Sequence, residues 1–193
     1  MRAVSLDDIT GLGRYEAIRD DFRRRIIQLK RARRVAVGDR VTFVFENFDT
    51  VLFQIQEMLR AENIGDLDRV REEIAVYNEL IPGSGELSST MLIEITQEDD
   101  IRAELVRLIG IDECVHLQVG EHRIAAVFEG GRSKEDKLSA VQYVRFGFDA
   151  AARAAFAKVE VPAHLVIEHR NYAARTAIEG AIRESLCIDL GDA

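Results

Sequence analysis

Two short turns between strand-like segments limit the fold of this chain more than any other feature of its sequence. The segments on either side of Gly38-Asp39 are 35–37 and 41–46, and those on either side of Gly120-Glu121 are 114–119 and 122–128. Two-residue turns that contain glycine join neighbouring antiparallel strands. Parallel strands need a crossover connection of roughly a dozen residues or more. The chain is therefore expected to form a mainly antiparallel sheet.

Helical patterns lie between the strand-like segments. The longest predicted helix covers about 14–34, where apolar residues recur at spacings of three and four. A second helix is predicted from a cap at Asp49 or Thr50 to about residue 63. Further helices are predicted over about 66–80, 98–109, 150–159 and 177–190, and further strands over 91–95, 138–148 and 164–169. The predicted fold class is α+β, with helices packed on a mainly antiparallel sheet and a long N-terminal helix.

Length and composition predict a single globular domain in the cytoplasm. The 193 residues are expected to form an N-terminal helical segment, 1–34, and an α+β body, 35–193. Two cysteines do not make a disulfide framework, which favours a reducing compartment. The N-terminus lacks the apolar core of a signal peptide, and no apolar run reaches the roughly 18–20 residues of a membrane span. We therefore expect a soluble protein with no membrane association.

The charge is divided unevenly along the chain. The net charge is −8, but residues 1–40 hold 11 Lys/Arg and 6 Asp/Glu, whereas the rest holds 15 and 28. The candidate basic surface on the first helix consists of Arg23, Arg24, Arg31 and Arg34. It is either an anion or nucleic-acid surface, or a solvated face that pairs with the acidic remainder of the chain or of a second subunit. Because the basic domain and interleaved aromatic residues of nucleic-acid surfaces are missing, we favour the second interpretation, with no nucleic-acid partner.

One strand face carries residue types that bind metals. Alternation places Cys114, His116 and Gln118 on the same face of their strand. A Cys-x-His pair supplies half of a tetrahedral zinc site. Since no further ligands follow at a recognisable spacing, we interpret this face as the polar outside of a hairpin. We expect no metal and no other cofactor.

The segment 41–62 combines strong fold signals with groups capable of chemistry. Its helical half carries Glu57 and Arg60, which lie one turn apart and can pair. One interpretation is a structural network that ties the helix to the sheet. The alternative is a polar pocket between the second helix and the sheet, in which Glu57 accepts a proton or hydrogen bond while Arg60 and Arg145 hold an anionic group.

Glu94 and Gln142 are the expected neighbours of that pocket. Strand alternation places Gln142 and Arg145 on opposite faces of one strand, so both line the pocket only if a bulge intervenes.

Five sequence blocks carry a resemblance to a known family. They are FEN-x-x-T at 45–50, QIQEMLR at 54–60, YNELIP at 77–82, TMLIEI at 90–95 and SAVQYVRF at 139–146. In their order they resemble the bacterial family catalogued as domain of unknown function 3501, over nearly the whole chain. The resemblance implies no activity, cofactor or catalytic residue. It implies a role beside rubrerythrin-like and iron–sulfur redox proteins, because genes of the family lie near theirs.

The role implied by the resemblance is an accessory one. The chain lacks the cysteines for an iron–sulfur cluster and the repeated E-x-x-H of a di-iron bundle. The leading prediction is thus a non-enzymatic intracellular binding or accessory protein, a homodimer that meets a protein partner in a redox system. The alternative is an enzyme or small-ligand-binding protein that uses the polar pocket.

Overall fold

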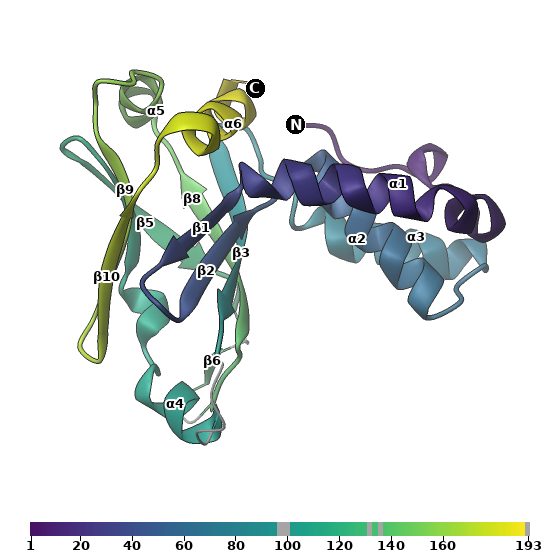
Figure 1. Ribbon diagram of the computed structural model, residues 1–193, viewed down its shortest axis with the longest axis horizontal. Coiled ribbons are helices and arrows are strands. Elements are labelled where there is room, and N and C mark those ends of the chain that lie inside the picture. Colours follow the sequence, from purple (N-terminus) through teal and green to yellow (C-terminus); the bar gives the residue numbers. More distant parts are fainter. Residues whose placement is uncertain (96–100, 131–132, 135–136, 192–193) are drawn as a thin grey trace.

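A helical lobe projects from one side of a strongly curled sheet (Figure 1). The computed structural model describes residues 1–95, 101–130, 133–134 and 137–191. The eight strands of the sheet are β1 (Arg34–Val37), β2 (Val41–Phe45), β3 (Glu86–Ile93), β4 (Val115–Val119), β5 (His122–Phe128), β8 (Val141–Gly147), β9 (Ala163–His169) and β10 (Tyr172–Ala177). Their order is β1-β2-β3-β8-β5-β4-β9-β10, and every neighbouring pair is antiparallel. The predicted antiparallel sheet is confirmed.

The lobe contains the 3-10 turn η1 (Leu6–Asp8) and the helices α1 (Leu12–Arg31), α2 (Phe48–Ala61) and α3 (Leu67–Asn78). The remaining elements lie around the sheet: α4 (Ile101–Arg107), η2 (Ile111–Glu113), β6 (Ser133–Lys134), β7 (Lys137–Leu138), α5 (Ala150–Phe156) and α6 (Gly180–Gly191). In Figure 1, α5 and α6 lie at one end of the curled sheet and α4 lies at the other. None of the described helices has the length and apolarity needed to cross a membrane.

The helix predicted over 14–34 corresponds to α1, which begins at Leu12 and ends at Arg31 and not at residue 34. Arg33 and Arg34 therefore lie outside it, Arg34 as the first residue of β1. The cap of α2 also differs from the prediction. It is Asn47, whose side chain accepts a hydrogen bond from the Thr50 amide at 3.0 Å, while the Thr50 hydroxyl accepts one from the Asn47 amide at 2.9 Å. Of the helix predicted over 98–109, residues 98–100 lie outside the described chain.

The curled sheet and the lobe each have their own hydrophobic cluster. The larger one fills the curled sheet with the inward residues of its strands, among them Phe43, Phe45 and Phe146, all fully buried. The smaller one joins Val51, Ile55 and their neighbours of α2 to α3 and the N-terminal segment. In the chain, α2 and α3 lie between β2 and β3. The lobe therefore contains residues from both sides of the division predicted at residue 34.

The last strand, β10, was not predicted from the sequence. Its residues YAARTA are mostly small and lack the β-branched and apolar pattern of a buried strand. Their stability comes from pairing with β9, in register from Tyr172 opposite His169 to Ala177 opposite His164. The closing helix consequently starts at Gly180 and not at residue 177.

Side chains, not a strand ladder, close the seam between β1 and β10. The Tyr172 hydroxyl donates to the Val37 carbonyl at 2.6 Å and accepts from the Arg40 amide at 3.0 Å. The Thr176 hydroxyl donates to the Ala36 carbonyl at 2.7 Å. A side chain at Gly38 would collide with Tyr172, since its Cβ would lie 2.4 Å from the hydroxyl oxygen. The sheet is thus almost a closed barrel, and we call it the barrel below.

The seam generates a testable prediction. Tyr172→Phe keeps the ring but leaves the Val37 carbonyl and the Arg40 amide without this partner, so we expect a loss of about 1–2 kcal/mol in the free energy of unfolding. Amide hydrogen exchange should become faster in β1 and β10 and stay unchanged in α2. If the substitution changes the exchange rates of β1, β10 and α2 by the same factor, Tyr172 does not hold the seam.

Candidate functional site

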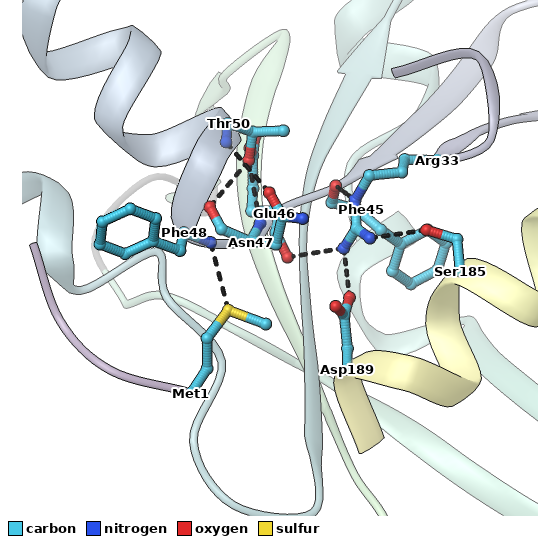
Figure 2. Close-up of polar contacts among 9 residues, drawn as sticks. All are labelled: Met1, Arg33, Phe45, Glu46, Asn47, Phe48, Thr50, Ser185 and Asp189. Atoms are coloured by element: carbon cyan, nitrogen blue, oxygen red, sulfur yellow. Dashed lines mark hydrogen bonds and ion pairs between the residues drawn. The ribbon is translucent and has the colours of Figure 1, made fainter. Parts of the chain in front are cut away.

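A buried arginine sits where the lobe meets the barrel (Figure 2). Arg33, two residues after α1, is 1% exposed and donates hydrogen bonds to the Phe45 carbonyl at 2.8 Å and the Glu46 carbonyl at 3.0 Å. It also donates to the Ser185 hydroxyl at 2.8 Å and forms a buried ion pair with Asp189, both on α6. One guanidinium therefore ties the end of α1, the end of β2 and the closing helix together.

Glu46 is a buried carboxylate beside this joint. It is 2% exposed, and its oxygens accept hydrogen bonds from Thr50 Oγ1 at 2.5 Å, Gln54 Nε2 at 3.0 Å and Thr90 Oγ1 at 2.6 Å. Two hydroxyls and an amide thus replace the water that this group loses on burial. The carboxylate connects β2, β3 and α2 at the base of the lobe.

Other polar residues of the lobe hold the N-terminal segment in place. Gln56 makes a pair of hydrogen bonds with the backbone of Thr10, at 2.6 and 3.1 Å. Asn78 does the same with the backbone of Val4, both at 2.9 Å. These side chains act as structural staples and are not available to a ligand.

A cavity of about 310 Å³ lies between α3 and the outer face of β8 and β5. This volume is at the lower end of the range of small-molecule sites. Its wall is mainly apolar, with one arginine, two glutamates and one serine: Val76, Glu79, Leu80, Ser88, Val127, Phe128, Glu129, Tyr143, Val144 and Arg145. It differs from the pocket considered in the sequence analysis, which was polar and lay beside the second helix, since this cavity is mainly apolar and lies beside α3.

The polar floor of the cavity consists of Ser88 and Arg145, which are paired in register on neighbouring strands. Arg145 donates to Glu86 Oε2 at 2.6 Å and to the Glu79 carbonyl, so its charge is largely compensated. Ser88 is 3% exposed and lines the cavity beside Arg145. A buried hydroxyl without a hydrogen-bond partner among the described residues belongs to the next residue, Ser89, which is not part of the cavity wall. A hydroxyl and a guanidinium on the floor of a mainly apolar cavity are the few polar groups that would orient a small ligand.

The other residues of the predicted pocket lie elsewhere. Glu57 and Arg60 are in the lobe, where Arg60 lies 3.4 Å from Glu57 and 3.6 Å from Glu16. Glu94 pairs with Arg34 near the edge of the barrel. Gln142 is 1% exposed on the inward side of β8, where it donates to the Ser139 carbonyl at 2.9 Å.

The five residues therefore do not form one pocket, and Arg145 alone lines the cavity. The predicted opposite orientation of Gln142 and Arg145 is confirmed, since no bulge interrupts the β3–β8 register.

Glu57 ties α1 to α2, not the helix to the sheet. Its carboxylate accepts from Arg19 Nε at 2.8 Å, Arg19 Nη2 at 2.7 Å and the Tyr15 hydroxyl at 2.9 Å. The hydrogen bonds from Arg19 hold the pKa of the Glu57 carboxyl at about 2, below its ordinary 4.5. Burial, together with the bond to Glu57, raises the pKa of the Tyr15 hydroxyl. These contacts form a structural network, but it lies within the lobe and does not tie the helix to the sheet as the first interpretation had it.

Most of the candidate basic residues form no ion pair with the acidic remainder of the described chain. Arg24 pairs with Asp21 of its own helix, and Arg34 pairs with Glu94. Arg23 and Arg31 are exposed and have no ion-pair partner among the described residues. The expectation that the body of the same chain neutralises this surface therefore holds for Arg34 and not for the arginines of α1.

Cys114 and His116 bring no further ligands together. No group of three His, Cys, Asp or Glu residues in the described chain has the arrangement of a metal site. His116 is 3% exposed, so the expected polar outer face is in fact covered at this position. Burial lowers the pKa of His116 and raises that of Cys114.

Comparison with known proteins places the chain in a family. A family model described as protein of unknown function (DUF3501) matches residues 3–190. The chain belongs to this family. A crystal structure from Burkholderia pseudomallei K96243, titled a novel protein of unknown function, is 30% identical and has a TM-score of 0.90.

The match covers 98% of this chain and 100% of the Burkholderia chain. No curated protein matches. The five sequence blocks of the DUF3501 resemblance lie in β2, α2, the end of α3, β3 and β8, the elements that form the joint, the lobe and the cavity floor. The association with redox proteins stays a prediction.

The Glu57 contacts give a prediction with a pH dependence. Glu57→Gln removes the charge that Arg19 binds, so we expect a loss of about 1–2 kcal/mol in the free energy of unfolding at pH 7. Because the folded-state pKa is lowered from 4.5 to about 2, the stabilisation is fully present above about pH 4.5 and is lost as the pH falls toward 2.

The difference between the parent and Glu57→Gln in urea unfolding should therefore shrink between pH 5 and pH 2.5. Glu16→Gln is the control, because the Glu16 side chain is 57% exposed and lies 3.6 Å from Arg60. A difference for Glu57→Gln that does not change with pH would contradict the lowered pKa.

Proposed function

We propose that this DUF3501 protein is a non-catalytic binding protein that holds a small, mainly apolar molecule in the cavity between α3 and the barrel. The single observation that carries the proposal is the mainly apolar cavity itself, which has the Ser88 hydroxyl and the Arg145 guanidinium on its floor. The neighbouring Arg145 has N–H groups beyond the two that bind Glu86 and Glu79. Together they form a short row of donors at the floor of an apolar cavity.

The charges of the cavity favour an uncharged ligand. Arg145 is compensated by Glu86, and Glu79 and Glu129 add negative charge at the wall. An anion would gain little from an arginine that is already paired and would be repelled by the glutamates. The aromatic rings of Phe128 and Tyr143 supply apolar surface. The ligand class is therefore a neutral ring or chain with a carbonyl or hydroxyl oxygen that accepts hydrogen bonds.

A binding role is also what the lining residues support chemically. No histidine or cysteine is among them, and the buried carboxylate of Glu46 is occupied by three donors. We place the protein in the cytoplasm as an accessory protein, supported by its two unpaired cysteines.

The test uses the neutral dye Nile red, which carries a carbonyl oxygen. We expect its fluorescence to rise on binding, with a dissociation constant in the micromolar range, about 1–100 μM. Val76→Trp adds bulk at the cavity wall and should weaken binding at least about tenfold, because the side chain competes for the same space. Val159→Trp is the matched control, since Val159 is 83% exposed and is not part of the cavity wall.

Ser88→Ala separates binding from folding. The substitution removes one hydroxyl and keeps Cβ, so the free energy of unfolding should change by about 1 kcal/mol or less, while Nile red binding weakens several-fold. The anionic dye anilinonaphthalene sulfonate should bind more weakly than Nile red. Equal binding by the two tryptophan variants, or tighter binding of the anionic dye, would contradict the proposed site.

A further inference from the structure

A second cavity, of about 490 Å³, lies between α5 and α6, at the end of the barrel where Figure 1 shows both helices. Its volume is within the range of small-molecule sites. The wall is apolar except for one arginine and one thiol: Ala150, Arg153, Ala154, Phe156, Ala157, Cys187, Leu190 and Gly191. None of these residues lines the cavity between α3 and the barrel, so the two cavities are separate.

The sequence of α5 explains why space is left beside α6. Residues 150, 153, 154 and 157 are spaced three and four apart, so they share one face of the helix and its C-terminal cap. Three of the four are alanine, which fills little of the space next to the helix. Arg153 is the only one of them with a long side chain.

Arg153 brings an uncompensated positive charge to this wall. It is partly buried, and its guanidinium forms no ion pair or hydrogen bond with the described residues. Asp149, one turn earlier, caps α5 instead and accepts a hydrogen bond from the Ala152 amide at 2.7 Å. In the first cavity, by contrast, Arg145 is paired with Glu86. A guanidinium that has lost part of its water without gaining a counter-ion is stabilised when an anion binds to it.

A second positive charge lies behind the wall. Arg183 of α6 is 5% exposed and lies 4.8 Å from the ring centre of Phe156, which lines the cavity. It donates hydrogen bonds to the carbonyls of Phe156, Lys158 and Val161, at distances between 2.7 and 3.0 Å. It forms no ion pair with a carboxylate of the described chain. Carbonyl oxygens satisfy its N–H groups but carry no net charge, so the charge of Arg183 adds to that of Arg153.

No carboxylate of the described residues lines this cavity. Glu160 and Glu179 lie near Arg183, but they line a different cavity. Burial raises the pKa of the Cys187 thiol, so the thiol stays uncharged at neutral pH. The wall therefore combines apolar surface and positive charge with no negative charge.

We propose that the cavity between α5 and α6 binds an apolar carboxylate, such as a medium-chain fatty acid. The carboxylate binds Arg153, whose planar guanidinium matches its two oxygens. The hydrocarbon chain packs on Phe156, Leu190 and the alanines of α5. The inference is independent of the proposed function, because the two cavities share no residue and select opposite ligand classes.

Other ligand classes use only one part of this wall. Inorganic phosphate would meet the guanidinium without gaining from the apolar surface, and a neutral chain would leave the guanidinium unpaired. The alanines at 150, 154 and 157 are exposed, so the cavity is open on one side and binding is weak. We expect a dissociation constant of about 0.1–1 mM for octanoate, which is weaker than that of Nile red in the first cavity.

The test is an NMR titration of the isotope-labelled full chain with octanoate, 1-octanol and inorganic phosphate, each up to about 3 mM. Octanoate should shift the backbone amide signals of α5 and α6 in a saturable way. Phosphate and 1-octanol should act there at least about tenfold more weakly, because each lacks one of the two interactions. As a neutral chain with a hydroxyl, 1-octanol should instead shift signals of α3 and β8, so a failure of the first cavity is seen separately.

Two variants test the two parts of the site. Arg153→Gln should weaken octanoate binding at least about tenfold and leave the effect of 1-octanol on α3 unchanged. Its control is Arg31→Gln, which removes the same charge from an exposed arginine that has no ion-pair partner among the described residues. Ala154→Phe fills the cavity and should abolish the shifts, whereas Ala17→Phe at an exposed position of α1 should not.

Four results would overturn the proposal. They are an absence of saturable shifts in α5 and α6 with octanoate, binding of 1-octanol or phosphate there as tight as that of octanoate, equal effects of Arg153→Gln and Arg31→Gln, and unchanged binding by Ala154→Phe. Octanoate shifts confined to α3 and β8 would assign the carboxylate to the first cavity and would also contradict the proposal.

Discussion

The Arg33 guanidinium is the group on which the arrangement of lobe and barrel depends. It is fully buried, and a charged group leaves water only when its charge and its N–H groups are matched. Asp189 matches the charge, while two backbone carbonyls at the end of β2 and the Ser185 hydroxyl take hydrogen bonds. The end of α1 and the closing helix α6 therefore meet at the same point, although they lie at opposite ends of the sequence.

The position of the lobe follows from this joint. Arg33 fixes the end of β2, and the chain then turns at Glu46 and Asn47 into α2. The buried Glu46 carboxylate bonds to residues of β3 and α2, which sets the start of that helix against the outer face of the sheet. As α3 packs on α2, it lies over β8 and β5 and encloses the cavity. A binding site at the boundary between lobe and barrel is thus a consequence of how the two parts are joined.

The sequence predicts the parts of this fold that local rules determine. Glycine turns specify the hairpins, and three- and four-residue spacing specifies α1. Strand alternation places Gln142 and Arg145 on opposite faces of one strand, as the uninterrupted β3–β8 register shows. What it cannot show is which residues meet across long separations. The run RARR reads as a solvated helix end, and only the arrival of Asp189 from 156 positions away turns Arg33 into the centre of a buried joint.

The same limit explains the missed site residue and the missed strand. Ser88 precedes the strand predicted over 91–95, whereas β3 already begins at Glu86, and only the packing of α3 makes this residue the floor of a cavity. The alanines of β10 carry no strand signal, and the contacts that hold them come from β9 and from the seam with β1. Glu57 was recognised as part of a network, but its partner Arg19 lies 38 positions earlier.

The most direct test of this account compares the unfolding of Asp189→Ala with that of Asp68→Ala in urea. The Asp189 substitution leaves the Arg33 charge buried without its counter-ion and should lower the free energy of unfolding by about 3–5 kcal/mol. Asp68 belongs to an exposed pair with Arg71, so its loss should change stability by less than about 0.5 kcal/mol. Equal effects of the two substitutions would show that the Arg33 joint does not hold the lobe on the barrel.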